Sequence, residues 1–182
     1  MCYANTTFID EQGNLLQNYS EELHLDAAKP QERYHKYHRR FLTKYRCSPV
    51  FGVIRRSALV MTRLIGKYEG SDIILLAELA LLGKFYEIPE YLFFRREHPQ
   101  MSLRANQTPE KIAVWFDPAN RGKLQLPMWR LLREHLLAIG RTKLSWSEKI
   151  SCYLHLRTFL RWKRRELRTE LTKAVKWIIV NG

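Results

Sequence analysis

An aspartate at the start of an apolar stretch is the residue in this sequence best suited by type and place to acid–base chemistry. Asp72 follows Ser71, and the apolar stretch runs to Gly83. Ser71 is expected to cap a helix there by accepting backbone N–H groups, and Gly83 to end it. A carboxylate that faces a cleft from a helix start can take the proton of a hydroxyl group. The alternative, in which Asp72 only favours the helix dipole, stays open.

A second set of polar residues follows an aromatic stretch. Arg95 and Arg96 carry guanidinium groups suited to bidentate phosphate contact, and one of them is expected to point away because strand neighbours face opposite sides. His98 is expected in a loop, where a neutral imidazole can ligate a metal, meet a phosphate or remain solvated. Further back, Gly52 follows Phe51 and allows the backbone to approach a ligand closely.

The stretch 70–98 is expected to position these residues as a buried helix followed by sheet. Apolar residues occur on every side of the helix, so it should lie inside the domain. Glu78, its inner charge, is expected to pair with an arginine rather than to do chemistry. Aromatic residues then predict strands at 85–88 and 91–94, with Pro89 as a turn or edge position between them.

The chain before this stretch predicts further short elements. They are, in order, a strand at 6–9, a tight turn at 10–14, an amphipathic helix at 30–45, a strand at 50–54 and a helix at 57–65. The prediction of a helix at 30–45 is based on aromatic residues that recur at helical spacing among basic residues. Ser57 is expected to cap the last of these elements.

The chain after His98 predicts helices alone. Proline and glycine punctuate 99–127, which holds one short helix at 109–116. A helix at 127–139 should end at Gly140, and the Ser145-Trp146-Ser147-Glu148 sequence resembles a capping box that begins another. Helical spacing continues to 179.

Length and composition favour one globular domain with a helical extension. The 182 residues carry a net charge of +13, concentrated at 33–63 and 141–176, which attracts phosphate on a nucleotide sugar, a nucleic acid or an anionic lipid. Three widely spaced cysteines indicate neither a disulfide framework nor a zinc site. This cysteine usage favours a reduced, cytoplasmic compartment. Because we find no signal peptide and no apolar run of membrane-spanning length, we expect the protein to be soluble or to lie at the inner face of the membrane.

Three segments together resemble a known family. They are GSDIILLAELALLGKFYEIPEYLFFRREH at 70–98, FIDEQG at 8–13 and CSPVFGVIRR at 47–56. In this order they resemble the C-terminal catalytic half of bacterial family 2 glycosyltransferases, over roughly residues 2–104. The resemblance implies an α/β fold, a partial GT-A-like, Rossmann-related mixed sheet at 1–104, followed by a helical C-terminal extension at 105–182. The nucleotide-binding half of the family would precede Met1, so the chain is expected to be inactive alone.

The resemblance also implies an activity and a set of site residues. A sugar would pass with inversion from a nucleotide-sugar donor to an acceptor hydroxyl on a glycan or lipid-linked acceptor, with Mg²⁺ or Mn²⁺ holding the leaving diphosphate. It places the catalytic base on Asp72 and a metal ligand on His98. Its substrate-binding positions are Phe51, Gly52, Arg55, Ser71, Arg95 and Arg96.

A function of another class stays open beside this one. The chain could be a non-enzymatic basic protein that binds nucleic acid or anionic membrane. The terminal helices carry Trp146, Trp162 and Trp177 among basic residues, which suits either an anionic membrane surface or a solvated face over a core stripe. Nucleic acid is the weaker partner, because no nucleic-acid-binding motif accompanies the aromatic residues of 34–41.

Overall fold

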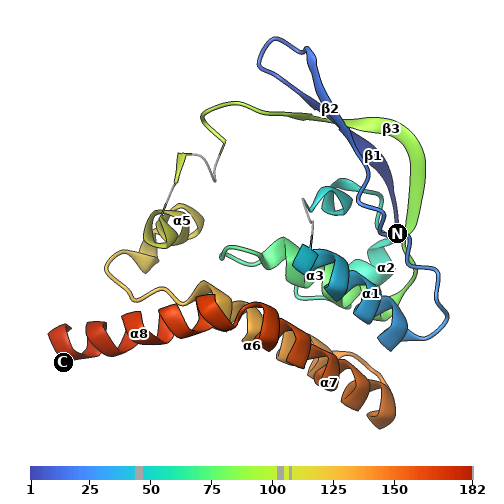
Figure 1. Cartoon of the computed structure of the whole chain (residues 1–182). Helices are drawn as coiled ribbons and strands as arrows, with labels where there is room; N and C mark the ends of the chain where they lie inside the picture. Colours follow the sequence, from blue (N-terminus) through green and yellow to red (C-terminus); the bar gives the residue numbers. More distant parts are fainter. Residues whose placement is uncertain (44–46, 102–104, 107, 182) are drawn as a thin grey trace.

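The computed structural model describes residues 1–43, 47–101, 105–106 and 108–181, and these form a mixed α/β structure. The sheet has three strands in the order β2-β1-β3. The central strand β1 (Cys2–Ile9) pairs antiparallel with β2 (Leu15–Tyr19) and parallel with β3 (Tyr86–Arg96). Seven α-helices lie in the described residues. The predicted α/β class is therefore confirmed at this level (Figure 1).

The turn between β1 and β2 forms where it was predicted. The Asp10 N–H donates to the Asn14 carbonyl at 3.0 Å, and the Asn14 N–H donates to Asp10 Oδ1 at 2.7 Å. Gly13 adopts a φ of +93°, which favours glycine. The hairpin is thus determined by contacts within five neighbouring residues.

The aromatic stretch after Gly83 is one strand, so the prediction of two strands is wrong. β3 runs through Pro89, and its pairing with β1 shifts register between Ala4 and Asn5 and again between Asn5 and Thr6. The Asn5 side chain donates to the Pro89 carbonyl at 2.9 Å. Because β3 is an edge strand, the missing N–H of proline is tolerated, and the irregularity is absorbed by the shifts.

Helix α3 (Ser71–Leu82) is buried and ends at Gly83, as predicted. Helix α1 (Pro30–Thr43) packs against it with the fully buried side chains of Tyr34 and Tyr37. Glu78 is buried and pairs with Arg141, whose Nη2 lies 2.6 Å from Glu78 Oε1. This confirms the expected arginine partner.

The segment between α1 and α3 differs from the prediction. The expected strand at 50–54 is a 3₁₀ helix η1 (Ser48–Phe51), after which Val53 forms an isolated bridge with Cys2. The expected helix at 57–65 is only α2 (Arg56–Leu59), with Arg55 and not Ser57 at its N-cap. It stops because the Thr62 hydroxyl accepts from the Leu64 N–H at 3.2 Å and Glu78 accepts from the Arg63 N–H at 3.0 Å. Both bonds replace helical ones.

The rest of the chain is helical, as predicted. Its elements are α5 (Pro109–Phe116), the 3₁₀ helix η2 (Pro118–Asn120), α6 (Pro127–Arg141), α7 (Trp146–Trp162) and α8 (Arg164–Asn181). Both bonds of the capping box at Ser145 and Glu148 are present. Gly140 lies inside α6 rather than at its end, so the predicted end of the helix is two residues early.

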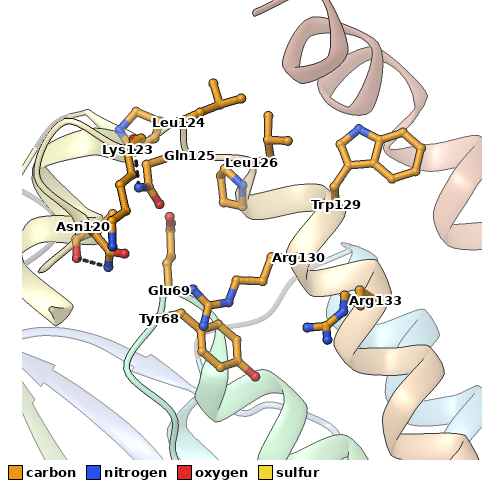
Figure 2. A pocket seen from close by; sticks show the side chains of 13 residues that line it. Tyr68, Glu69, Asn120, Lys123, Leu124, Gln125, Leu126, Trp129, Arg130 and Arg133 are labelled. Atoms are coloured by element: carbon orange, nitrogen blue, oxygen red, sulfur yellow. Dashed lines mark hydrogen bonds between the residues drawn. The ribbon is translucent and has the colours of Figure 1, made fainter. Parts of the chain in front are cut away.

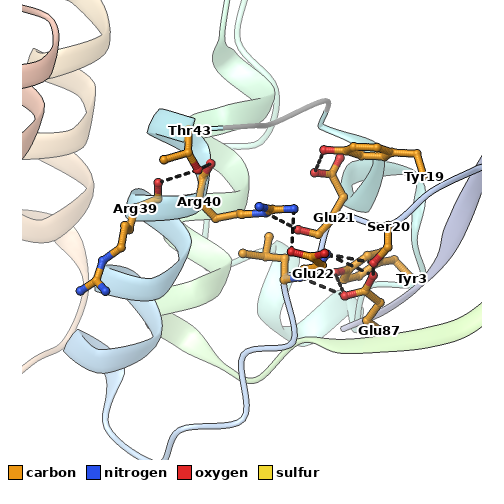
Figure 3. Close-up of polar contacts among 10 residues, drawn as sticks. Tyr3, Tyr19, Ser20, Glu21, Glu22, Arg39, Arg40, Thr43 and Glu87 are labelled. Atoms are coloured by element: carbon orange, nitrogen blue, oxygen red, sulfur yellow. Dashed lines mark hydrogen bonds and ion pairs between the residues drawn. The ribbon is translucent and has the colours of Figure 1, made fainter.

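The main core joins the sheet side to the helical part. Its buried residues include Leu76 of α3 and Phe85 before β3, together with Ile139 of α6 and Leu156 of α7. A network of polar contacts ties the segment after β2 to this frame, with the Glu87 carboxylate accepting from Tyr3 Oη at 3.0 Å and the Leu23 N–H at 2.9 Å (Figure 3). None of the helices described here has the length and apolar character needed to cross a membrane.

Candidate functional site

The amino end of α3 and the carboxyl end of β3 lie on one side of the molecule. The two elements are joined by only three residues, 83–85, and Figure 1 shows that the chain turns back between them. The start of α3 and the end of β3 therefore both face the side on which α5 lies (Figure 1). Ligands of sheets with parallel strands bind outside the carboxyl ends of those strands. We take this side as the candidate site.

Asp72 lies half-buried in the first turn of α3. Its Oδ1 accepts the Ile73 N–H at 2.9 Å, a contact that the positive end of the helix favours. No other hydrogen bond to its carboxylate is found among the described residues. A partly exposed carboxylate with one oxygen left over can still accept a proton from a ligand.

Ser71 does not cap α3, so that prediction is wrong. The N-cap is Gly70, which adopts a left-handed φ of +79°, and no side chain caps the helix. Ser71 begins the helix proper, and with an exposed fraction of 2% it lies inside the fold. A glycine takes over because the chain turns sharply into the helix at this point.

The predicted loop residues Phe51, Gly52 and Arg55 lie beside the sheet. The exposed Phe51 ring stacks on Phe93 of β3, with centroids 4.9 Å apart. Gly52 faces β1, where an added Cβ would lie 2.4 Å from the Cys2 carbonyl oxygen. Its close approach is thus to the protein's own backbone. Arg55 is exposed at the start of α2.

Arg95 and Arg96 separate as predicted for strand neighbours. The Arg95 guanidinium lies over the Phe8 ring, 5.8 Å from its centroid. Arg96 is exposed and donates to the carbonyls of Asp10, at 3.2 Å, and of Glu11. Both side chains are therefore held at the end of β1 and β3, where Arg96 supports the hairpin turn.

His98 follows β3 and is half-buried, and its carbonyl accepts from the Met101 N–H at 3.2 Å. Among the described residues, no three His, Cys, Asp or Glu side chains gather into a group that could hold a metal. The described residues therefore supply at most two such side chains to a metal at this side.

A pocket lined in part by Tyr68 and Glu69, shortly before α3, was not predicted (Figure 2). It has a volume of about 540 Å³ and lies between Tyr68–Glu69 and the segment that runs from α5 to α6. The Arg130 guanidinium lies over the Tyr68 ring, with its Cζ 4.1 Å from the ring centroid. Burial, and then the nearby carboxylates of Glu170 and Asp72, raise the pKa of Glu69. The pocket therefore combines an aromatic wall with charges of both signs.

A cluster of four histidines was also missed. His35 and His38 of α1, His135 of α6 and His155 of α7 form a chain of ring contacts with centroids 4.2 to 5.2 Å apart. The Tyr34 hydroxyl lies 3.0 Å from His135 Nδ1, whereas neither ring nitrogen of His38 has a hydrogen-bond partner among the described residues. Burial lowers the pKa of His38 to about 2 and that of His135 to about 3. Both rings are therefore neutral and act as core.

Comparisons with known proteins do not assign this chain to a family. The chain has no significant match among protein-family models, curated proteins or solved structures.

Proposed function

We propose that this chain is the acceptor-side part of a GT-A-like glycosyltransferase. The observation that carries the proposal is the placement of Asp72 at the start of α3, on the same side as the end of β3 with Arg95, Arg96 and His98. The resemblance of 70–98, 8–13 and 47–56 to bacterial family 2 enzymes supports it.

The proposed reaction is a direct displacement. Asp72 would take the proton of an acceptor hydroxyl as its oxygen attacks the anomeric carbon of a nucleotide-activated sugar. The bond from that carbon to the diphosphate breaks, the nucleoside diphosphate leaves, and the configuration inverts. Arg95 would offer positive charge to the leaving diphosphate at the strand end. A divalent ion such as Mg²⁺ or Mn²⁺, when bound, would neutralise that diphosphate, with His98 as one ligand.

The test is a comparison of Asp72→Asn with the unmodified chain. Each is mixed with the nucleotide-binding half of a family 2 glycosyltransferase, a panel of nucleoside diphosphate sugars, Mg²⁺ or Mn²⁺, and glycan or lipid-linked acceptors. Release of nucleoside diphosphate and the mass of the acceptor are followed. Loss of the base should lower turnover by about 10² to 10⁴-fold while donor binding changes little.

Asp26→Asn serves as the matched control, because it makes the same chemical change at an exposed aspartate of the segment before α1. It should leave turnover unchanged. Substantial turnover by Asp72→Asn would remove Asp72 as the base. If no nucleotide sugar is bound or consumed by any form, the transferase proposal itself is wrong.

A further inference from the structure

Helices α7 and α8 follow each other end to end with a bend at Lys163, and we call the pair the rod (Figure 1). The Lys163 N–H donates to the Phe159 carbonyl at 2.8 Å at the end of α7, and the Lys163 carbonyl accepts from the Leu167 N–H at 2.9 Å at the start of α8. The two helices turn a common side toward the protein, because Leu156 and Phe159 of α7 and Leu167 of α8 are all buried.

The rod has one side that packs on the protein and an opposite side that does not. Its buried residues, Cys152, Leu156, Phe159, Leu167 and Glu170, all lie within one narrow arc when residues are placed about 100° apart, and they meet the core of α1, α3 and α6. The opposite arc holds Trp146, Ile150, Leu154, Arg157, Arg161, Arg164, Arg165, Arg168, Thr172, Val175, Lys176 and Ile179, all of them exposed. We call these residues the outer face.

The middle of the outer face is strongly basic. Arg157, Arg161, Arg165 and Arg168 succeed one another at intervals of three or four residues, which places them on one line. The three acidic residues of the rod lie elsewhere. Glu148 accepts from the Ser145 N–H at 2.8 Å, Glu166 pairs with Lys163, and the buried Glu170 accepts from the Met128 N–H at 2.9 Å. The basic line therefore has no carboxylate on its own face to neutralise it.

Both ends of the outer face are apolar. Trp146, Ile150 and Leu154 lie at one end and Val175 and Ile179 at the other, each more than half exposed. A helix face with arginines between exposed tryptophan and aliphatic residues is the pattern of helices that lie in a membrane interface. A nucleic acid would use the arginines but would gain nothing from Ile150 or Ile179, which need an apolar medium.

We propose that the outer face docks on the surface of an anionic lipid bilayer. The arginines would meet the headgroup phosphates, and the two apolar ends would enter the boundary between headgroups and acyl chains. The α7–α8 rod would lie flat on the bilayer with the rest of the protein above it. This partner does not depend on the proposed transferase, because it rests on α7 and α8 alone.

The experiment is vesicle co-sedimentation of the full chain at physiological salt. Vesicles of phosphatidylcholine with about one-third phosphatidylserine should bind the protein, and pure phosphatidylcholine should bind it far more weakly. Each basic residue near an anionic surface contributes about fivefold to binding, so Arg161→Gln/Arg165→Gln/Arg168→Gln should weaken binding about 100-fold. The tryptophan emission should shift to the blue on binding, because the Trp146 ring leaves water, and this shift should be smaller in Trp146→Phe.

The matched control removes the same charge elsewhere. Lys111→Gln/Arg121→Gln/Lys123→Gln neutralises three exposed residues of the α5–α6 segment and should bind vesicles within about twofold of the unmodified chain. These residues line a pocket with Trp177, which lies on the packed side of α8, so the width of the helix, about 10 Å, separates them from the outer face. Ile150→Ser/Ile179→Ser keeps every charge and should also weaken vesicle binding. Its effect should be larger at high salt than at physiological salt, because salt screens the arginines and leaves the apolar contacts as the main attraction.

Three results would overturn the proposal. The first is equal binding by the two triple variants, which would leave only a non-specific effect of net charge. The second is retention of full vesicle binding by Ile150→Ser/Ile179→Ser together with tight binding to short DNA, which would assign the face to nucleic acid. The third is a stable dimer, seen by light scattering, that Ile150→Ser/Ile179→Ser dissociates. None of these readouts involves sugar transfer, so failure here leaves the transferase test unaffected.

Discussion

Gly52 is held in place by a backbone that passes directly beside it. A Cβ there would lie 2.4 Å from the Cys2 carbonyl oxygen and 2.7 Å from Tyr3 Cβ. These distances are too short for non-bonded carbon and oxygen atoms, so β1 or η1 would have to shift. Gly52, in the segment that resembles an acceptor loop, is therefore needed for the close packing of η1 against β1.

Gly52→Ala should lower the free energy of unfolding by about 2 kcal/mol, because an added methyl group in a packed site forces backbone shifts. Urea unfolding followed by circular dichroism measures this. Gly83→Ala is the control, since a Cβ at Gly83 meets nothing within 4 Å and its backbone is extended. An unchanged urea midpoint for Gly52→Ala would show that η1 moves freely from β1.

At the scale of elements, a buried arginine closes the end of α3. Arg33 of α1 donates to the carbonyls of Ala80 and Leu81 at 2.8 and 2.9 Å, and also to those of Ala27 and Ala28 at 2.9 and 2.8 Å. The last carbonyls of a helix have no partner inside it, and they carry the negative end of its dipole. A cation at this point satisfies both needs, although burial lowers its pKa.

Arg33→Ala should lower the free energy of unfolding by about 3 kcal/mol, since it leaves buried carbonyls without donors. Arg39→Ala provides the comparison, because Arg39 is an exposed arginine of the same helix and its loss should cost under about 0.5 kcal/mol. Both are measured by thermal and urea unfolding. If the two substitutions lowered the free energy of unfolding equally, Arg33 would stabilise the fold only by its positive charge and not by its hydrogen bonds to the last carbonyls of α3.

At the scale of the whole molecule, the histidine cluster couples folding to pH. Burial lowers the pKa of His38 to about 2, of His135 to about 3 and of His155 to about 4, with the Arg39 charge also acting on His155. In the unfolded chain these groups return to a pKa of about 6.5. The unfolded state thus binds more protons below that pH, and stability is lost as the pH falls.

The unfolding free energy should be constant above about pH 7 and then fall by about 1.4 kcal/mol per pH unit for each of the three histidines, or about 4 kcal/mol per unit near pH 5. Urea unfolding at a series of pH values from 8 to 4.5 measures the slope. His38→Phe should reduce the slope of unfolding free energy against pH by about a third, because unfolding of this variant takes up one proton fewer. An unchanged slope in this variant would place the acid sensitivity elsewhere.

Several local predictions from the sequence are confirmed, for reasons that lie within a few residues. The turn at 10–14 is closed by Asp10 and Asn14, and the start of α7 by Ser145 and Glu148. The half-exposed Asp72 likewise lies in the first turn of α3, as the sequence indicated. The errors occur where distant residues compete, as when Glu78 takes the Arg63 N–H and α2 stops early.

The sequence by itself thus determined most of the helices, where most of those begin and end, and that the positive charge is concentrated at 33–63 and 141–176. Those properties depend on side chains three or four positions apart. Only the tertiary structure decided that β3 continues through Pro89, that four histidines meet between α1, α6 and α7, and that α7 and α8 share one outer face. Each of these depends on which surfaces are covered by segments distant in the chain. No local pattern carries that information, because burial is set by the packing of the whole chain.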